Sequence, residues 1–540
     1  MLGLTNARIY TFNPDLPSAS TLVIDQGKII AVGETASYLF IDNPRIEIVD
    51  LGGRTVIPGL TDAHIHLQTY SMGLQKIDCE TASLSECLEK VAVRAQQTPP
   101  GSWILGHGWN QNNWLDGFGT CHQLDAITSD HPVYLTAKSL HAGWINSAAS
   151  RLAGITAQTP DPAGGRIQRD EHGFPTGILF ETAMALVTNI LPEPQPATVA
   201  EAIKDALPLL WQMGLTGVHD FDRQTCFTAL QLLHEAGDLK LRVTKCLPIE
   251  ILPQVVEIGL RSGFGDDFLR IGSIKAFADG ALGPRTAAML QPYEGEPDNR
   301  GIAMLDAEEI FERGRLAVEN GLSLAIHAIG DRANHEVLDA YAQLRRLEKN
   351  NPSLSRGHLR HRIEHVQIIH PDDVHRLAQL NIIASMQPIQ AVSDFPMADR
   401  YWGSRAAHSY AWRTILNFGT SMAYGSDAPV ESPNPFWGLH AAVSRRRPDG
   451  SPGPNGWYPG QRLNLTEALH GFTIGAAFAA GMENRLGKLA PGYLADLVIL
   501  DTDLMDCEID HIRDIQPAAT MIAGEWVHNT LPVSASSAAV

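Results

Sequence analysis

Short apolar runs alternate with segments of helical periodicity through the middle of the chain, from about residue 58 to about residue 484. This alternation is typical of repeated βα units. These strand-like runs, most of them apolar, predict eight barrel strands, at 61–66, 132–137, 217–221, 271–277, 323–328, 361–366, 382–386 and 422–425. The pattern therefore predicts an α/β fold built on a (β/α)8, or TIM, barrel.

Both ends of the chain have a different pattern, in which short strand-like runs are separated by Gly, Pro, Asn and Asp. Such runs occur in residues 1–57 and again in residues 485–530, where turn residues punctuate them in the same way. We expect these two segments to pair into one small β-sandwich. The last residues, 531–540, are rich in Ser and Ala and are predicted to form a disordered tail.

The barrel region is longer than the fold requires. A bare barrel takes about 250 residues, whereas the eight predicted strands extend over roughly 400, so the chain must contain insertions. The largest excess lies at about 70–210. We expect this segment to form an inserted lobe over the mouth of the barrel.

Composition and charge narrow the class of protein. The 540 residues are 44% hydrophobic and 19% charged, as in an ordinary soluble chain. The formal net charge of −19 leaves no basic surplus for the phosphate contacts that dominate nucleic-acid affinity. No apolar stretch reaches spanning length, and the first residues do not resemble a signal peptide. We therefore expect a cytoplasmic protein with a small-molecule substrate and without nucleic-acid or membrane partners; whether it forms a homo-oligomer stays open.

Candidate metal ligands stand where the predicted strands end. His64 and His66 are two apart on a strand, so both imidazoles can point to one face and reach one metal ion. Alone, this pair is a weak signal, because it fits two structural histidines equally well. His327, His365 and Asp427 follow later predicted strands, and the catalytic residues of such barrels come from the carboxyl ends of several strands. Their joint occurrence predicts a metal site.

Lys275 lies inside the predicted strand 271–277. An unpaired ammonium inside a barrel is costly, so this lysine either meets a carboxylate or is modified. Carboxylation of its amine by carbon dioxide would create an anionic oxygen ligand able to bridge two metal ions. The residues alone leave both interpretations open.

The order of these residues resembles the amidohydrolase superfamily, and the phrases around them are similar to its family 3, or YtcJ-like, branch. The matching phrases lie at 59–66, 279–287, 327–333, 362–365, 425–429 and 487–497. The resemblance runs from about residue 5 to about residue 528, and every core ligand position is present. Pro284 stands where we expect a serine, which leaves the metal assignment unchanged.

The resemblance implies a centre of one or two divalent metal ions, with zinc favoured by the four imidazoles and the carboxylate oxygens. The implied ligands are His64, His66, Lys275, His327, His365 and Asp427. Lys275, carboxylated by carbon dioxide, would bridge the two ions, which would share a hydroxide as the nucleophile. Asp427 would take the proton from the attacking water and deliver it to the leaving nitrogen.

The reaction that the resemblance implies is hydrolysis of a carbon–nitrogen bond other than a peptide bond, in an amide or an N-substituted formamide. His141, after the second predicted strand, and Arg285, after the fourth, are expected to face the substrate. One alternative is a one-metal deaminase on the same barrel, but that reaction does not need Lys275. Another is a non-catalytic regulatory protein of the same fold, against which the complete ligand set argues.

Overall fold

The computed structural model describes residues 1–43, 45–111, 114–115, 117–137, 142–162, 164–351 and 359–532. The chain divides into two compact units, Met1–Tyr70 with Pro196–Val540, and Ser71–Gln195. Most of the tail that we expect to be disordered, 533–540, lies outside the described residues, and so does His141. Among the described helices, none is both long enough and apolar enough to cross a membrane.

An eight-stranded parallel sheet is the centre of the first unit. Ile65, at the end of the first strand, bridges to Ala428, just after the last strand, and this contact closes the sheet into a barrel. The predicted (β/α)8 barrel is thereby confirmed. Its strands follow one another around the sheet in chain order: β8 (Leu60–Ile65), β15 (Leu215–Asp220), β16 (Arg242–Pro248), β17 (Leu269–Phe277), β18 (Leu324–Ala328), β19 (Arg362–His365), β20 (Ile383–Met386) and β21 (Met422–Tyr424).

A helix follows each barrel strand, as the βα pattern predicts. In α11 the apolar residues recur at helical spacing, so that Val337, Tyr341 and Leu344 are buried along one side. Helix α10 begins after Asp306, whose carboxylate accepts a hydrogen bond from the amide of Glu309 (2.9 Å). In strand order the helices are α2 (Leu67–Leu74), α8 (Gln224–Glu235), α9 (Leu252–Glu257), α10 (Ala307–Glu319), α11 (Asp331–Asn350), α12 (Pro371–Gln379), α13 (Pro388–Trp402) and α15 (Pro435–Ser444).

One strand of the barrel was predicted wrongly from the sequence. The run at 132–137 is not a barrel strand; it forms β11 (Val133–Ala137) of the second unit. The barrel uses β16 instead, whose apolar residues are interrupted by Arg242 and Lys245. Both cations are buried because they pair with Asp496 and Asp220. Buried ion pairs therefore hide this strand from a search for apolar runs.

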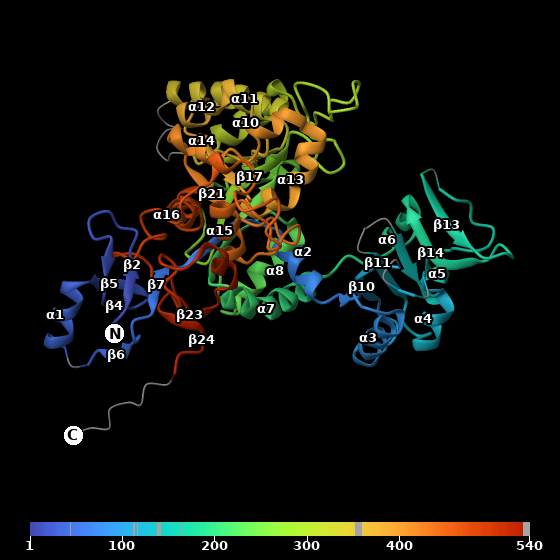
Figure 1. Cartoon of the computed structure of the whole chain (residues 1–540), viewed down its shortest axis with the longest axis horizontal. Coiled ribbons are helices and arrows are strands. Elements are labelled where there is room, and N and C mark those ends of the chain that lie inside the picture. The colour runs from blue at the N-terminus through green and yellow to red at the C-terminus, as the bar shows by residue number, and fades with distance from the viewer. Residues whose placement is uncertain are drawn as a thin grey trace. The chain divides into compact units, whose positions relative to one another are not determined.

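The two ends of the chain form two further sheets of the first unit. Strand β7 (Thr55–Pro58) pairs antiparallel with β22 (Leu497–Leu500), so that the blue N-terminal strands and the red C-terminal strands share one sheet (Figure 1). The other strands of this sheet are β2 (Arg8–Tyr10), β3 (Ser18–Ala19), β23 (Pro517–Ile522) and β24 (Glu525–Asn529). The second sheet contains β1 (Leu2–Thr5), β4 (Leu22–Asp25), β5 (Lys28–Val32) and β6 (Glu47–Asp50). Side chains of both sheets share one apolar core, as predicted for a sandwich.

The second unit has its own sheet and its own core. Its six strands are β9 (Ile77–Asp78), β10 (Ile104–Trp109), β11, β12 (Ala142–Ile145), β13 (Gly165–Arg169) and β14 (Pro175–Glu181). Its helices include α3 (Leu84–Gln97), α4 (Cys121–Ile127) and α5 (Ser147–Leu152) (Figure 1). Trp109, Trp114 and Trp144 lie in the core. The segment 70–210, in which we expect a lobe, also contains α7 (Pro196–Gln212), which belongs to the first unit.

Candidate metal centre

The six residues predicted to hold metal all lie near the carboxyl ends of barrel strands. They are His64 (β8), His66 (after β8), Lys275 (β17), His327 (β18), His365 (β19) and Asp427 (after β21). Five of the six are buried, and the side chain of His66 is 30% exposed. This is the end of the barrel at which active sites of the fold are built.

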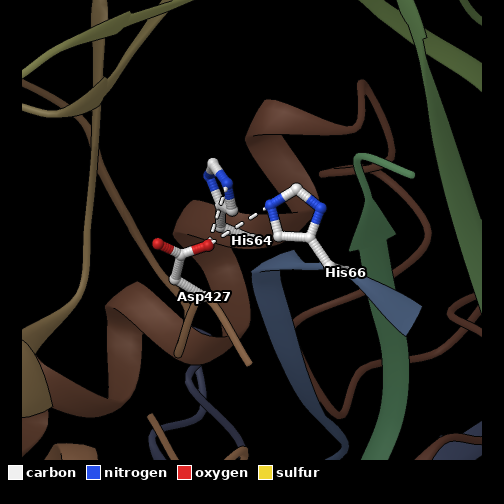
Figure 2. A group of neighbouring side chains, drawn as sticks. All are labelled: His64, His66 and Asp427. Atoms are coloured by element: carbon white, nitrogen blue, oxygen red, sulfur yellow. Dashed lines mark ion pairs between the residues drawn. The ribbon is translucent and has the colours of Figure 1, made fainter. Parts of the chain in front are cut away.

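His64, His66 and Asp427 form a close group (Figure 2). Nε2 of each histidine lies 3.5 Å from Oδ1 of Asp427. The residues meet because the barrel closes: the amide of Asp427 donates a hydrogen bond to the carbonyl of His64 (2.7 Å). Two imidazole nitrogens and one carboxylate oxygen at this spacing can bind a single divalent ion.

His327 and His365 extend the group along the neighbouring strands. The ring centroid of His365 lies 5.0 Å from that of His64 and 4.5 Å from that of His327. The parallel register places His327 opposite Glu364 and Ala328 opposite His365, so the two histidines are offset by one residue on neighbouring strands. A second pair of imidazoles therefore adjoins the first.

Lys275 is buried beside these imidazoles, and no carboxylate of the described residues lies within ion-pair distance of it. Its Nζ lies 4.7 Å from the ring centroid of Phe221 and 4.9 Å from that of Phe277. Burial lowers the pKa of Lys275 to about 8. Part of its amine is therefore neutral near neutral pH, and the neutral amine is the nucleophilic form.

Burial also favours the neutral form of three imidazoles. Loss of solvent, followed by the nearby Lys275 ammonium, lowers the pKa of His64 well below its usual range and that of His327 to about 3. Loss of solvent and the neighbouring imidazoles lower the pKa of His365 in the same way. Neutral imidazole is the form that binds metal.

Each imidazole uses one ring nitrogen to hydrogen-bond an oxygen atom of the chain. The pairs are His64 Nδ1 with Glu364 (2.7 Å), His66 Nδ1 with Asp222 (3.3 Å), His365 Nδ1 with Gln387 (2.9 Å) and His327 Nε2 with the carbonyl of Gly280 (2.9 Å). A nitrogen that donates to oxygen fixes the tautomer and leaves a lone pair on the other nitrogen. Each of the four histidines thus has one nitrogen available for a metal ion, and the set fits one or two divalent ions.

Backbone strain is concentrated at two of these residues. His365 and Asp427 have φ angles of 78° and 62°, and Val366 has a φ of 43°. The left-handed region costs about 1–3 kcal/mol for a residue other than glycine, and it is rarest for a β-branched one. The fold therefore holds these ligands in positions that their own backbone preferences oppose.

Asp427 is also held through its second oxygen. Gln390, in the first turn of α13, donates from Nε2 to Oδ2 of Asp427 (3.2 Å), and its own Oε1 accepts from Gln367 (3.1 Å). Oδ1 stays directed at the two Nε2 atoms of His64 and His66. The carboxylate is thereby oriented with one oxygen free for chemistry.

Asp222 and Gln387 orient two histidines but belong to none of the sequence motifs. Asp222 follows β15 by two residues, and Gln387 directly follows β20. This position at a strand end is the signal that could have identified them. Their partners depend on the register of neighbouring strands, which the sequence does not show.

Arg285, expected to face the substrate, lies in the loop after β17. Its guanidinium pairs with Glu296 (2.5 Å) and lies 5.3 Å from the ring centroid of Tyr401. In the described part of the chain it contacts none of the six ligands. His141, the other expected substrate residue, lies outside the described residues.

Comparisons with known proteins identify the family that the chain is similar to. The model of a family described as "Amidohydrolase family" matches residues 47–528. The Arabidopsis thaliana protein named LONG AFTER FAR-RED 3 is 34% identical, over 98% of this chain and 91% of its own length. The N-substituted formamide deformylase of Arthrobacter pascens is 29% identical, over 97% of each chain.

A similar fold is found among solved structures. The crystal structure of an uncharacterized metal-dependent hydrolase from Pyrococcus furiosus has a TM-score of 0.78 and 31% sequence identity. It covers 94% of this chain and 100% of its own. The likeness therefore includes the barrel, the terminal sheets and the second unit.

Proposed function

This chain belongs to the amidohydrolase family, and we propose that it hydrolyses a carbon–nitrogen bond outside peptides, in an amide or an N-substituted formamide, with the help of divalent metal. Family membership makes it a hydrolase; the bond, the substrate and the metal belong to the proposal. The formamide class is supported by the similarity to the Arthrobacter deformylase. The substrate is a small molecule, as expected from the sequence.

One observation carries the proposal. Four imidazoles, each with one ring nitrogen hydrogen-bonded to an oxygen of the chain, gather at one end of the barrel with Asp427 and Lys275, which has no ion-pair partner among the described residues. Imidazoles with one nitrogen hydrogen-bonded and the other available, beside a buried carboxylate, are the ligand set that a divalent metal centre uses.

The residues fit zinc best, since imidazole nitrogens with carboxylate oxygens suit it. His64, His66 and Asp427 would hold one ion, and His327 with His365 would hold a second. When bound, such ions lower the pKa of coordinated water and polarise a substrate carbonyl. Lys275, carboxylated on Nζ by carbon dioxide, would contribute oxygens to both positions. Its burial with no counter-ion among the residues that the structure describes supports this modification.

Asp427 is the proton carrier in this proposal. Its Oδ1 accepts the proton of the attacking water, and the same oxygen then returns the proton to the nitrogen that leaves, so that no proton is gained or lost overall. Gln390 holds Oδ2 during this exchange. The assignment of Arg285 and His141 to the substrate stays a prediction, as do the cytoplasmic location and the oligomeric state.

Metal analysis combined with a turnover screen tests the proposal. We expect purified protein to carry about one to two divalent ions per chain, and removal of the ions by chelator to abolish turnover, which added zinc restores. The screen would cover formamides, N-acyl amines, cyclic amides, esters and aminopurines, the last as a test for a deaminase. A protein that stays fully active after the chelator has removed all metal would contradict the proposal.

A further inference from the structure

The two halves of the centre differ in the charge of the groups that orient their imidazoles. His64 and His66 both donate from Nδ1 to a carboxylate, of Glu364 (2.7 Å) and of Asp222 (3.3 Å). A carboxylate acceptor makes the opposite nitrogen more basic and a stronger metal ligand. This half of the centre, defined by His64 and His66, is called the first position below.

The carboxylate of Glu364 is itself held by a buried cation. Arg362 donates to both oxygens of Glu364, at 2.9 Å for Oε2, and both side chains are at most 2% exposed. Arg362 also donates to the carbonyl of Ala63, next to His64 in β8. Arg362, Glu364 and His64 therefore form a chain from cation to carboxylate to imidazole.

A buried cation also anchors the residue that orients His66, but it does so through the main chain of that residue and a neighbouring carboxylate. The buried ammonium of Lys245 pairs with Asp220 (2.5 Å) and donates to the main-chain carbonyl of Asp222. The carboxylate of Asp222 accepts from the amide (3.1 Å) and the hydroxyl (3.0 Å) of Thr69, in addition to His66. Lys245 thereby fixes the strand end from which Asp222 reaches the imidazole.

Lys245 also decides the role of a nearby acidic cluster. Asp220, Asp222 and Cys226 have ligand atoms within 4.8 Å of one another, a spacing that a metal ion could use. The ammonium of Lys245 already supplies a positive charge there, and Cys226 donates from its thiol to Asp220 (3.4 Å). The cluster is thus an anchor for His66.

In the other half of the centre, no carboxylate of the described residues is both held by a buried cation and placed to orient an imidazole. His365 donates to the neutral amide oxygen of Gln387, and His327 to the neutral carbonyl of Gly280, both at 2.9 Å. The carboxylate of Asp279 comes within 3.5 Å of His327. However, it accepts three main-chain amides at 2.8–3.0 Å, so it is committed to the loop. This half, defined by His327 and His365, is called the second position.

We propose that the two positions have unequal metal affinity: the first position fills first and holds its ion more tightly, and Arg362 and Lys245 act as positioning residues through Glu364 and Asp222. The inference rests on the proposed metal centre and deepens it. Partners of this kind typically change metal affinity by about 10–100-fold when they are mutated, so the difference is large enough to separate two binding events. The protein with one ion is then a distinct, stable form.

Two reciprocal isosteric substitutions test the inference. Metal-free full-length protein is titrated with zinc in competition with a chromophoric chelator, and bound zinc is counted by mass spectrometry. Wild type should show two binding events. Glu364→Gln should weaken only the tighter event, by about 10–100-fold, and Gln387→Glu should strengthen only the weaker event.

The chain offers a matched control for each substitution. His361, which is buried, donates to the partly buried Glu348 (2.8 Å) in a pair of the same chemistry, and neither partner is one of the six candidate ligands. Glu348→Gln should therefore leave both events unchanged. Gln231→Glu, on the exposed side of α8, controls for the added charge. If Glu364→Gln fails to fold because Arg362 loses its partner, Asp222→Asn replaces it and should weaken the tighter event.

The outcomes separate the inference from the function on which it rests. Two zinc ions bound with equal affinity in wild type would overturn the inference and leave the proposed metal centre intact. A shift of the weaker event by Glu364→Gln, or of the tighter event by Gln387→Glu, would overturn it as well. No zinc binding by folded wild-type protein would overturn the proposed function itself.

Discussion

The barrel and the second unit both contain buried parallel strands, but they bury different side chains. In the barrel, Asp220, Lys245, Arg362 and Glu364 are each at most 1% exposed. In the second unit, no Asp, Glu, Lys or Arg of the described residues is buried, and the core is apolar and rich in tryptophan. The barrel thus buries paired charges, whereas the second unit buries apolar side chains.

The difference shows where the fold accepts an energetic cost. Burying an ionised group costs several kcal/mol unless it is paired, whereas burying a large apolar side chain stabilises by about 1.5–3 kcal/mol. In the barrel the buried pair of Arg362 and Glu364 contacts His64, and the buried pair of Lys245 and Asp220 anchors Asp222, which contacts His66. The cost is thus tied to the candidate centre. Barrel substitutions should therefore change chemistry and metal content, and substitutions in the second unit should change stability.

The largest effect is expected in the barrel, at Asp427. Asp427→Asn keeps an oxygen that can face the metal but cannot accept a proton at neutral pH. We expect turnover to fall by about 10²–10⁴-fold, the usual contribution of general acid–base catalysis, with the fold preserved. Turnover and metal content must be measured on the same preparation.

Metal content decides how this result is interpreted. A variant that loses both ions would report on binding, so only a metal-loaded Asp427→Asn protein tests the proton transfer. Wild-type turnover by that protein would show that another group carries the proton. It would also weaken the contrast between the barrel and the second unit, because a buried carboxylate of the barrel would then lack a chemical role.

The sequence identifies the residues of the candidate centre better than the groups that hydrogen-bond to them. His64, His66 and His327 can be found because each stands at or near the end of an apolar run, and a strand end has a known place in the fold. His365 follows a run with only one apolar residue, so it is found through the phrase at 362–365. The partner of His365 cannot be found in this way. Gln387 is adjacent only once β19 and β20 are paired in their observed register.

Contacts between residues distant in sequence also explain the strand that was predicted wrongly. The run at 132–137 is apolar enough for any buried parallel strand, and its true neighbours are β10 and β12 of the second unit. Strand β16 contains Lys245 and Arg242, which are buried only because Asp220 and Asp496 lie far away in sequence but close in space. Pairing of buried charges is a tertiary property, so apolar periodicity cannot show it.

In the second unit, the largest expected effect is on stability, at Trp144. This side chain is fully buried, and its ring packs edge-on against Trp114 with centroids 6.1 Å apart. Trp144→Ala should lower the free energy of unfolding of this unit by about 3–5 kcal/mol, as other large-to-small core substitutions do. Denaturant unfolding followed by hydrogen exchange measures the change.

Zinc content should stay at the wild-type value in this variant, because Trp144 is not among the ligands or their partners. Trp437→Ala is the control, since Trp437 is 46% exposed and its removal leaves no cavity. Loss of zinc in folded Trp144→Ala would contradict the expectation that substitutions in the second unit change only stability. It would mean that the second unit contributes to the metal centre as well as to stability.

The smallest expected effect is on local stability, at a helix-capping motif that occurs in both units. Helix α4 of the second unit begins with a capping box in which Thr120 accepts from the amide of Gln123 (3.4 Å). In the first unit, α16 (Leu465–His470) begins with the same motif, in which Asn464 accepts from the amide of Glu467 (2.9 Å). Loss of an N-cap costs about 0.5–2 kcal/mol, and the shorter bond should place Asn464→Ala above Thr120→Ala in that range.

Each cap substitution should act only within its own unit, because it removes a local hydrogen bond and no buried charge. Hydrogen exchange should speed up in α4 for Thr120→Ala and in α16 for Asn464→Ala, with zinc content unchanged in both. The pair thus measures how separately the two units open, at an energy too small to unfold either of them. Faster exchange in α16 after Thr120→Ala would show that the units open together, and the barrel and the second unit would then have to be treated as one cooperative structure.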